Sequence, residues 1–237
     1  MRTAALLSLI LLAPTSLVGP ASAAAAKPPV LVELFTAQGC RPCTEANEHL
    51  NRLAERPGVL ALTFSVDYWD YLGWTDTFAE PEYAERQKAY VARLKLREPY
   101  TPQVVVDGEE QAEGLKSGEV DRLVRAASVE PRYPPDMRFV GERRVDVGSG
   151  RAPRGGAEVW LVRYDPRAVE VVVRAGDNRG ETVVQRNVVR QYVRLGSWRG
   201  RPQAYRVPAA PDDGLRTAVI VQAPRGGRVI GVAQPKS

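Results

Sequence analysis

Residues 31–43 read LVELFTAQGCRPC and contain the only two cysteines of the chain, Cys40 and Cys43. An apolar run rich in strand-forming residues leads to Gly39, and a helical pattern begins at the cysteine pair. Cys40 is therefore expected in the first turn of a helix, where unpaired backbone N–H groups and the helix dipole stabilise a thiolate. Cys43 lies one turn later and more shielded, so it is placed to resolve a mixed disulfide formed by Cys40.

Two other uses of a C-x-x-C pair compete with redox chemistry. A zinc site needs about four ligands, whereas the chain offers two Cys and one His, and His49 lies on the same predicted helix. A purely structural disulfide across so short a loop removes little entropy from the unfolded chain and stabilises weakly. The composition therefore favours dithiol redox chemistry, with no metal and no cofactor.

The first residues predict export. A positively charged start precedes an apolar stretch over 4–18, and the small residues ASA at 21–23 match a cleavage site, so residues 1–23 are expected to be a signal peptide. The stretch contains Pro14 and is short for a membrane span, so we expect no stable span after cleavage, with a retained N-terminal anchor as the alternative. The predicted location is periplasmic or secreted, where two lone thiols are best explained by chemistry.

The composition fits two modest globular domains. The chain has 237 residues, 44% of them hydrophobic, and a net charge of +5. The arginines that give this charge are scattered through the second half without interleaved aromatic residues, so a solvated basic surface is favoured and no nucleic-acid partner is expected. We predict one domain over residues 27–131 and a second over 136–237.

Strands and helices alternate in the first predicted domain. Buried strands are expected over 30–36 and 59–66, with a helix over 42–55 between them. This order implies parallel strands joined by a right-handed crossover, and it places the cysteine pair at the carboxyl end of the first strand. The remaining predicted elements are a helix over 82–96, a strand over 104–106 and a helix over 118–128.

An aromatic loop, DYWDYLGWTDTF, follows the second predicted strand at residues 67–78. It leaves the sheet at the same edge as Cys40, so Tyr68, Trp69 and Trp74 are candidates for a substrate-binding wall beside the thiol. The alternative is a loop whose aromatic side chains pack on the domain and serve as scaffold.

The succession of strand, C-x-x-C helix, strand, helix, then Thr-Pro before a hairpin and a last helix resembles a thioredoxin fold. The resemblance implies a cis Thr101–Pro102 bond opposite the cysteine pair. Such a bond presents the backbone of Thr101 to an extended peptide beside Cys40. The alternative is a trans Pro102 that begins an edge strand.

The same resemblance implies a buried carboxylate behind the resolving cysteine. Glu33, in the first predicted strand, is the candidate proton acceptor, although its spacing to Cys40 is one residue longer than in thioredoxins. An ion-paired glutamate is the alternative, and Asp67 and Asp70 are further candidates. Arg41, between the cysteines, favours the Cys40 thiolate by its charge.

A narrower resemblance covers most of the chain. The segments FTAQGCRPC, VDYWDYLGW, RQKAY and YTPQVVVDG are similar to an exported bacterial thioredoxin-like family catalogued as a domain of unknown function. The similarity continues through residues 186–190 and 195–198. Members often carry His where this chain has Ser65, so no role of an imidazole can be carried over to that position.

Beyond residue 127 the pattern changes to short β-rich runs separated by turn clusters. Two of these runs, over 157–164 and 168–175, are predicted as separate strands on either side of a break. Short strands at this spacing are typical of an antiparallel sandwich. The predicted fold class is therefore an α/β thioredoxin-like domain followed by a β-rich, sandwich-like C-terminal domain.

These patterns indicate an exported thiol-disulfide oxidoreductase that exchanges disulfides through Cys40 and Cys43. Its expected partners are protein or small-molecule thiols and disulfides, and a redox protein of the cell envelope. One alternative is a non-catalytic periplasmic binding module with a stable bridge. Another is a Cu(I)-binding chaperone, because Cu(I) accepts two sulfur ligands, although the chain contains only Met1 and Met137 as further sulfur donors.

Overall fold

The computed structural model describes residues 27–210 and 214–235, and the predicted signal peptide, residues 1–23, lies outside them. The helices are α1 (Cys43–Leu53), α2 (Pro81–Arg93) and α3 (Ser117–Val129), with a short 3-10 helix η1 (Asp70–Leu72). The strands are β1 (Val30–Thr36), β2 (Val59–Ser65), β3 (Gln103–Val106), β4 (Glu110–Glu113), β5 (Met137–Phe139), β6 (Arg144–Val147), β7 (Ala157–Val172), β8 (Thr182–Trp198), β9 (Gln203–Arg206), β10 (Arg216–Gln222) and β11 (Val229–Ala233).

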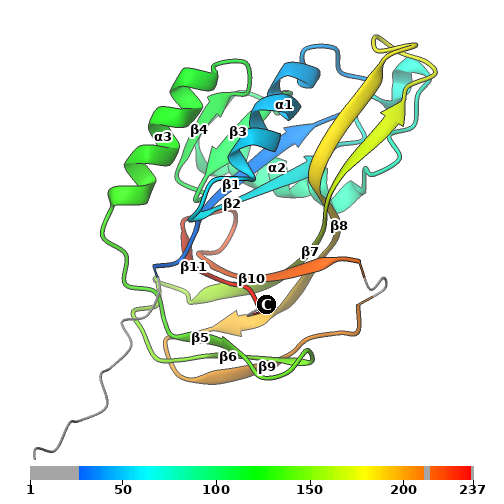
Figure 1. The fold of residues 1–237 in the computed structure, drawn as a ribbon. Coiled ribbons are helices and arrows are strands. Elements are labelled where there is room, and N and C mark those ends of the chain that lie inside the picture. Colours follow the sequence, from blue (N-terminus) through cyan, green and yellow to red (C-terminus); the bar gives the residue numbers. More distant parts are fainter. Residues whose placement is uncertain (1–26, 211–213, 236–237) are drawn as a thin grey trace, which may run out of the picture.

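Most strands belong to one mixed sheet of eight strands, in the order β11-β10-β7-β8-β2-β1-β3-β4 (Figure 1). β1 pairs parallel with β2 and antiparallel with β3, and all of its residues are buried because both faces of the sheet are covered here. On one face, Val32 and Leu34 pack with Leu50 of α1 and with α3. On the other face, Phe35 packs edge-on against Tyr90 of α2. The continuous apolar run of β1 follows from this double burial.

A long hairpin of β7 and β8 joins the second half of the chain to this sheet. β8 pairs antiparallel with β7 and parallel with β2, where Thr63 lies opposite Val188. Two side chains reinforce the junction: Thr63 Oγ1 donates to the carbonyl of Arg186 at 2.7 Å, and Asn187 Nδ2 donates to the carbonyl of Ala61 at 2.7 Å. The sheet is therefore continuous across both halves of the chain.

The predicted fold class, two successive domains, is wrong. A thioredoxin-like domain followed by a sandwich-like β domain was expected, whereas one mixed sheet takes strands from both halves. The runs over 157–164 and 168–175 form a single strand, β7, because Asp165 and Pro166 occupy an irregularity in its register with β8 and make no turn.

A smaller sheet of three strands, in the order β5-β6-β9, packs on the second half of the large sheet. Trp198 is fully buried between them and donates its indole N–H to the carbonyl of Gly148 at 3.1 Å. Val145, Leu161 and Val219 surround it in the same apolar core. This core is separate from the apolar core around the cysteines. The small sheet therefore packs against β7 and β8 and contributes no residue to the core that contains the cysteine pair.

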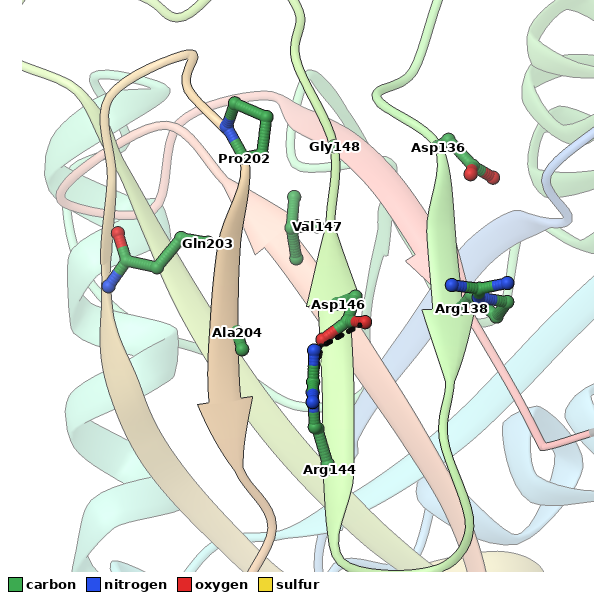
Figure 2. A pocket seen from close by; sticks show the side chains of 9 residues that line it. All are labelled: Asp136, Arg138, Arg144, Asp146, Val147, Gly148, Pro202, Gln203 and Ala204. Atoms are coloured by element: carbon green, nitrogen blue, oxygen red, sulfur yellow. Dashed lines mark hydrogen bonds and ion pairs between the residues drawn. The ribbon is translucent and has the colours of Figure 1, made fainter.

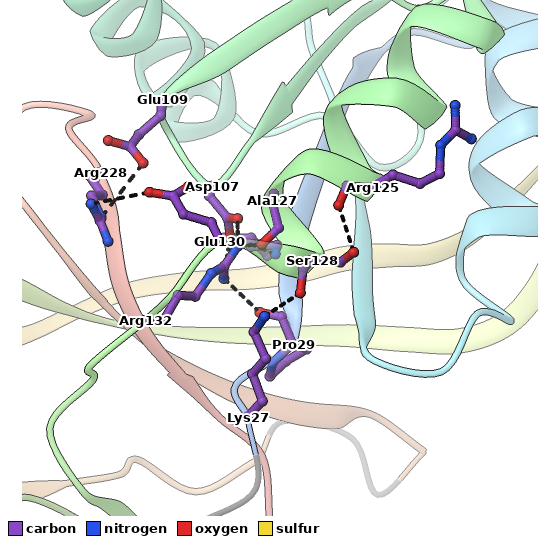
Figure 3. A network of polar contacts seen from close by, with 11 residues as sticks. Lys27, Pro29, Asp107, Glu109, Arg125, Ala127, Ser128, Glu130, Arg132 and Arg228 are labelled. Atoms are coloured by element: carbon purple, nitrogen blue, oxygen red, sulfur yellow. Dashed lines mark hydrogen bonds and ion pairs between the residues drawn. The ribbon is translucent and has the colours of Figure 1, made fainter.

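A polar network holds the turn between β3 and β4 in place (Figure 3). The carboxylate of Asp107 accepts a hydrogen bond from the backbone N–H of Leu31 at 2.9 Å and forms an ion pair with Arg132, which follows α3. The carbonyl of Asp107 also accepts from the N–H of Val229 at 2.7 Å, which ties the turn to β11. Burial raises the pKa of Asp107, against the opposing effects of the Leu31 hydrogen bond and of Arg132.

Candidate functional site

The cysteine pair lies between the end of β1 and the start of α1. Cys40 and Cys43 form a disulfide, and their Cα atoms are 5.4 Å apart. The backbone N–H of Cys43 donates to the carbonyl of Cys40 at 3.0 Å, which closes the turn that begins α1. Both cysteines are 0% exposed. α1 begins at Cys43, so Cys40 lies in the turn before the helix and not in its first turn, where it was predicted. A substrate cannot reach either sulfur in this conformation.

One predicted site residue, Thr101, contacts Cys40, and two others, Trp69 and Pro102, adjoin Thr101. The Thr101–Pro102 peptide bond is cis, and the hydroxyl of Thr101 donates to Cys40 Sγ at 3.4 Å. The hydroxyl oxygen of Thr101 in turn accepts a hydrogen bond from Trp69 Nε1 at 2.7 Å. Pro102 is buried, and its ring lies beside Gly114 together with the methyl group of Ala46. Trp69 thus orients Thr101, and Thr101 contacts the sulfur.

The side chains of the other two aromatic candidates donate hydrogen bonds to other residues of the protein. Trp74 Nε1 donates to Gln38 Oε1 at 2.9 Å, and the side chain of Gln38 is fully buried two residues before Cys40. Tyr68 donates its hydroxyl to Gln87 Oε1 at 3.1 Å, and burial raises the pKa of Tyr68 to about 12. The aromatic loop therefore holds the cysteine loop through its polar groups.

Glu33 lies in a separate buried cluster. Both of its carboxylate oxygens accept hydrogen bonds from Arg86, at 2.6 and 3.0 Å, and Tyr90 donates its hydroxyl to the same carboxylate. The guanidinium of Arg86 also lies 4.8 Å from the centre of the Tyr192 ring and 5.6 Å from that of Phe64. Burial is the largest single effect and disfavours the charged guanidinium, but the Glu33 carboxylate together with Tyr192 and Tyr90 outweighs it and raises the pKa of Arg86. The structure matches the ion-paired alternative for Glu33, since its oxygens bind α2 residues and not the cysteines.

Other features of the described residues do not form a competing site. A surface hollow of about 380 Å³ lies on the small sheet, where Arg144 and Asp146 form an ion pair (Figure 2). Within residues 27–210 and 214–235, no three His, Cys, Asp or Glu side chains gather closely enough to hold a metal ion. None of the helices in that part of the chain has the length and apolar character needed to cross a membrane.

Comparison with protein-family models identifies the family of the chain. A family model described as a protein of unknown function, DUF1223, matches residues 31–222. The chain belongs to the DUF1223 family. The expected membership in a family catalogued as a domain of unknown function is thereby confirmed. No curated protein sequence matches the chain.

Two solved structures resemble this DUF1223 protein. The X-ray crystal structure of protein AGR_C_4864 from Agrobacterium tumefaciens shares 30% sequence identity at a TM-score of 0.70, over 86% of this chain and 92% of that one. HBP35 of Porphyromonas gingivalis has a TM-score of 0.55 at 12% identity, over 88% of this chain and 74% of that one. The second likeness extends to the fold alone.

The second half of this DUF1223 protein supplies a residue to the cysteine loop. Asn178, in the turn between β7 and β8, donates through Nδ2 to the carbonyls of Gln38 at 2.7 Å and Cys40 at 3.1 Å. Asn178 is 2% exposed. The neighbouring Gly176 is so close to the cysteine loop that a Cβ atom added to it would lie 3.9 Å from the Cα of Gly39. The tip of the hairpin therefore packs on the cysteine loop, near the start of α1 (Figure 1). The sequence predicted only a turn at this segment, because Asn178 and Cys40 are 138 positions apart and local patterns do not reveal such a contact.

A buried polar cluster lies next to the same loop. Asp76 Oδ2 accepts the backbone N–H of Gln38 at 2.7 Å, and Gln185 Nε2, from β8, donates to Ser65 Oγ at 3.3 Å. Burial raises the pKa of Asp76, while the hydrogen bonds from Gln38 and Phe78 oppose the rise. Asp76 is 4% exposed and was not singled out from the sequence, where Asp67 and Asp70 were preferred. The sequence feature that could have indicated Asp76 was its place in the aromatic loop, but Asp67 and Asp70 share that feature.

Proposed function

We propose that this DUF1223 protein exchanges disulfides with protein or small-molecule thiols through Cys40 and Cys43. The observation that carries the proposal is the disulfide at the start of α1, with the Thr101 hydroxyl 3.4 Å from Cys40 Sγ. A hydroxyl donor stabilises negative charge on that sulfur, and the positive end of the α1 dipole, which begins at Cys43, favours it as well. Arg41, exposed between the cysteines, adds a positive charge in the same turn.

The exchange proceeds in two displacements. A substrate thiolate attacks Sγ of Cys40, the Cys40–Cys43 bond breaks, and its electron pair remains on Cys43 as a thiolate. A second substrate thiolate then attacks the substrate sulfur of this mixed disulfide and releases Cys40 as a thiolate. The substrate dithiol is oxidised to a disulfide and the protein disulfide is reduced by the same two electrons. The reverse sequence reduces a substrate disulfide.

The place of action is part of the proposal. Residues 1–23 have the charge, apolar stretch and small-residue site of a signal peptide, which supports a periplasmic or secreted protein. In such a compartment a redox protein of the cell envelope is the natural partner for returning the cysteine pair to its starting state. Determining the first residue of the protein isolated from cell fractions tests this part.

The burial of both sulfurs favours a second candidate, a non-catalytic binding module. In that case the Cys40–Cys43 bond is a permanent bridge beneath the hairpin tip, and the protein binds its partner without exchange. Asn178 and Trp74 then serve only to fix the loop around the bridge. The two candidates differ in whether the disulfide turns over.

Insulin reduction by dithiothreitol in the presence of catalytic amounts of the mature protein separates them. Exchange activity predicts an acceleration that is lost in Cys40→Ser and in Cys43→Ser, while a Thr101→Val variant keeps a reduced rate. A rate equal to that without protein contradicts the proposal and supports the binding module. Titration of the reduced protein with Cu(I) tests the chaperone alternative, which requires stoichiometric, tight binding that both cysteine variants lose.

A further inference from the structure

Asn47 places a buried side-chain amide in α1, four residues after Cys43. Asn47 is 2% exposed in α1, and its Oδ1 accepts a hydrogen bond from the Thr36 hydroxyl at 2.9 Å. The Nδ2 atom of Asn47 contacts no acceptor among residues 27–210 and 214–235. Buried polar groups are almost always hydrogen-bonded, because leaving one unpaired is unfavourable, and an exception calls for a specific explanation.

The position of this amide points to Cys43. Asn47 follows Cys43 by four residues in α1, so the two side chains are neighbours on one face of the helix. Helical side chains lean toward the N-terminus, so the Asn47 amide lies over the turn that holds Cys43. Cys43 is 0% exposed, which excludes water as a ready partner for its sulfur. Helical spacing therefore places this donor near the sulfur that gains a charge on reduction.

We propose that the side-chain amide of Asn47 donates a hydrogen bond to the Cys43 thiolate when the disulfide is reduced. The inference rests on the proposed exchange function and names a residue for its least accessible step. In the disulfide, Cys43 Sγ is a weak acceptor and the amide N–H stays unpaired. In the first displacement the electron pair of the broken S–S bond goes to Cys43, and the amide N–H stabilises that charge.

The other polar groups around the disulfide have other partners. The Thr101 hydroxyl donates to Cys40, and Asp76 accepts the N–H of Gln38. The charged residues at the start of α1, Arg41 and Glu45, are exposed to solvent. A buried thiolate at Cys43 without a hydrogen-bond donor is unfavourable, since burial in apolar surroundings raises the pKa of a thiol. Asn47 supplies the missing donor.

The same amide serves both directions of exchange. When the protein oxidises a substrate, Cys43 is the leaving group, and a more stable thiolate leaves faster. When the protein reduces a substrate, the Cys43 thiolate attacks the mixed disulfide at Cys40. The bond-breaking transition state is common to both, so Asn47 acts in each. Its larger effect is on the equilibrium, because it stabilises the reduced state and is unpaired in the oxidised one.

The test compares two asparagines of one helix. Asn51, one turn after Asn47, donates to the carbonyl of Val184 at 3.4 Å, and its buried Oδ1 has no donor within the part of the chain that the structure describes. The equilibrium between each mature protein and dithiothreitol is measured by trapping free thiols with an alkylating agent. For Asn47→Leu we expect the reduced-to-oxidised ratio to fall about tenfold, since a hydrogen bond to a charged group is of that order. Asn51→Leu is expected to stay within about twofold of the wild-type ratio.

A second readout is independent of turnover. In a Cys40→Ser background, the rate of Cys43 alkylation against pH gives the pKa of that thiol, and Asn47→Ala should raise it by about one unit. Equal shifts in the Asn47 and Asn51 variants, or an unchanged ratio and pKa in a folded Asn47 variant, overturn the inference. A wild-type protein that accelerates no exchange overturns the proposed function instead, while the Cys43 pKa still decides the role of Asn47.

Discussion

Removing the Asn178 side chain should open the disulfide to small thiols. Asn178 donates to the carbonyls of Gln38 and Cys40, and these two bonds hold the hairpin tip on the cysteine loop. A buried hydrogen bond contributes about 1 kcal/mol net, so Asn178→Ala weakens the closed state by about 1–2 kcal/mol. That difference raises the population of open molecules by a factor of about 5–30. The disulfide is reactive only when open, since both cysteines are 0% exposed.

The assay is the rate of disulfide reduction under excess dithiothreitol in native buffer, with samples quenched by an alkylating agent. Asn178→Ala should be reduced about 5–30 times faster than wild type, while the free energy of global unfolding falls by no more than the same 1–2 kcal/mol. Asp177→Ala is the matched control, because Asp177 occupies the same tip and is exposed. Wild-type reduction rates in Asn178→Ala, or an equal acceleration in Asp177→Ala, refute the role of the tip as a cover.

Three further predictions concern residues around the site. Glu33→Gln leaves the buried charge of Arg86 unpaired and should lower the free energy of unfolding in urea by about 3–5 kcal/mol, with the alkylation rate of Cys40 unchanged in the folded fraction; a changed alkylation rate revives Glu33 as a proton acceptor. Trp69→Ala should slow exchange more than Trp74→Ala, because only Trp69 donates to the Thr101 hydroxyl that contacts Cys40; equal rates in both contradict this, and melting temperatures identify a simple loss of packing. Because burial raises the pKa of Asp76, the folded protein holds its proton more tightly than the unfolded chain, so the Asp76 contribution to stability falls as pH rises through the folded-state pKa; wild type should therefore be less stable relative to Asp76→Asn at pH 7 than at pH 4, and the opposite trend contradicts the shift.

Local patterns predicted the centre of the molecule well. The apolar run of β1, the helix that opens at Cys43 and the strand at 59–65 depend on periodicity within a few residues, and the structure has all three. Thr101 at Cys40 was expected from a family resemblance that placed two distant segments side by side. Each of these features could be predicted because it depends either on the pattern of a short segment or on the arrangement that the family resemblance implies.

The rest depends on contacts between residues far apart in the chain. Nothing in the sequence around Asn178 shows that its amide reaches Cys40, because a turn residue and a ligand of the backbone have the same local pattern. The gap between the runs over 157–164 and 168–175 was interpreted as a break between strands, but a register irregularity at Asp165–Ala168 lets β7 continue across it. Glu33 lay close to the cysteines in sequence, yet the ion pair with Arg86 decided its role.

The equilibrium reduction potential of the Cys40–Cys43 disulfide tests the central claim most directly. It is obtained by incubating the mature protein in glutathione or dithiothreitol buffers of defined ratio and trapping the thiols present at equilibrium. An exchange-active pair predicts a reversible two-electron transition within the range of known dithiol oxidoreductases, about −270 to −120 mV. A potential below about −300 mV, typical of structural disulfides in exported proteins, would contradict the claim and identify the bridge beneath the hairpin tip as permanent.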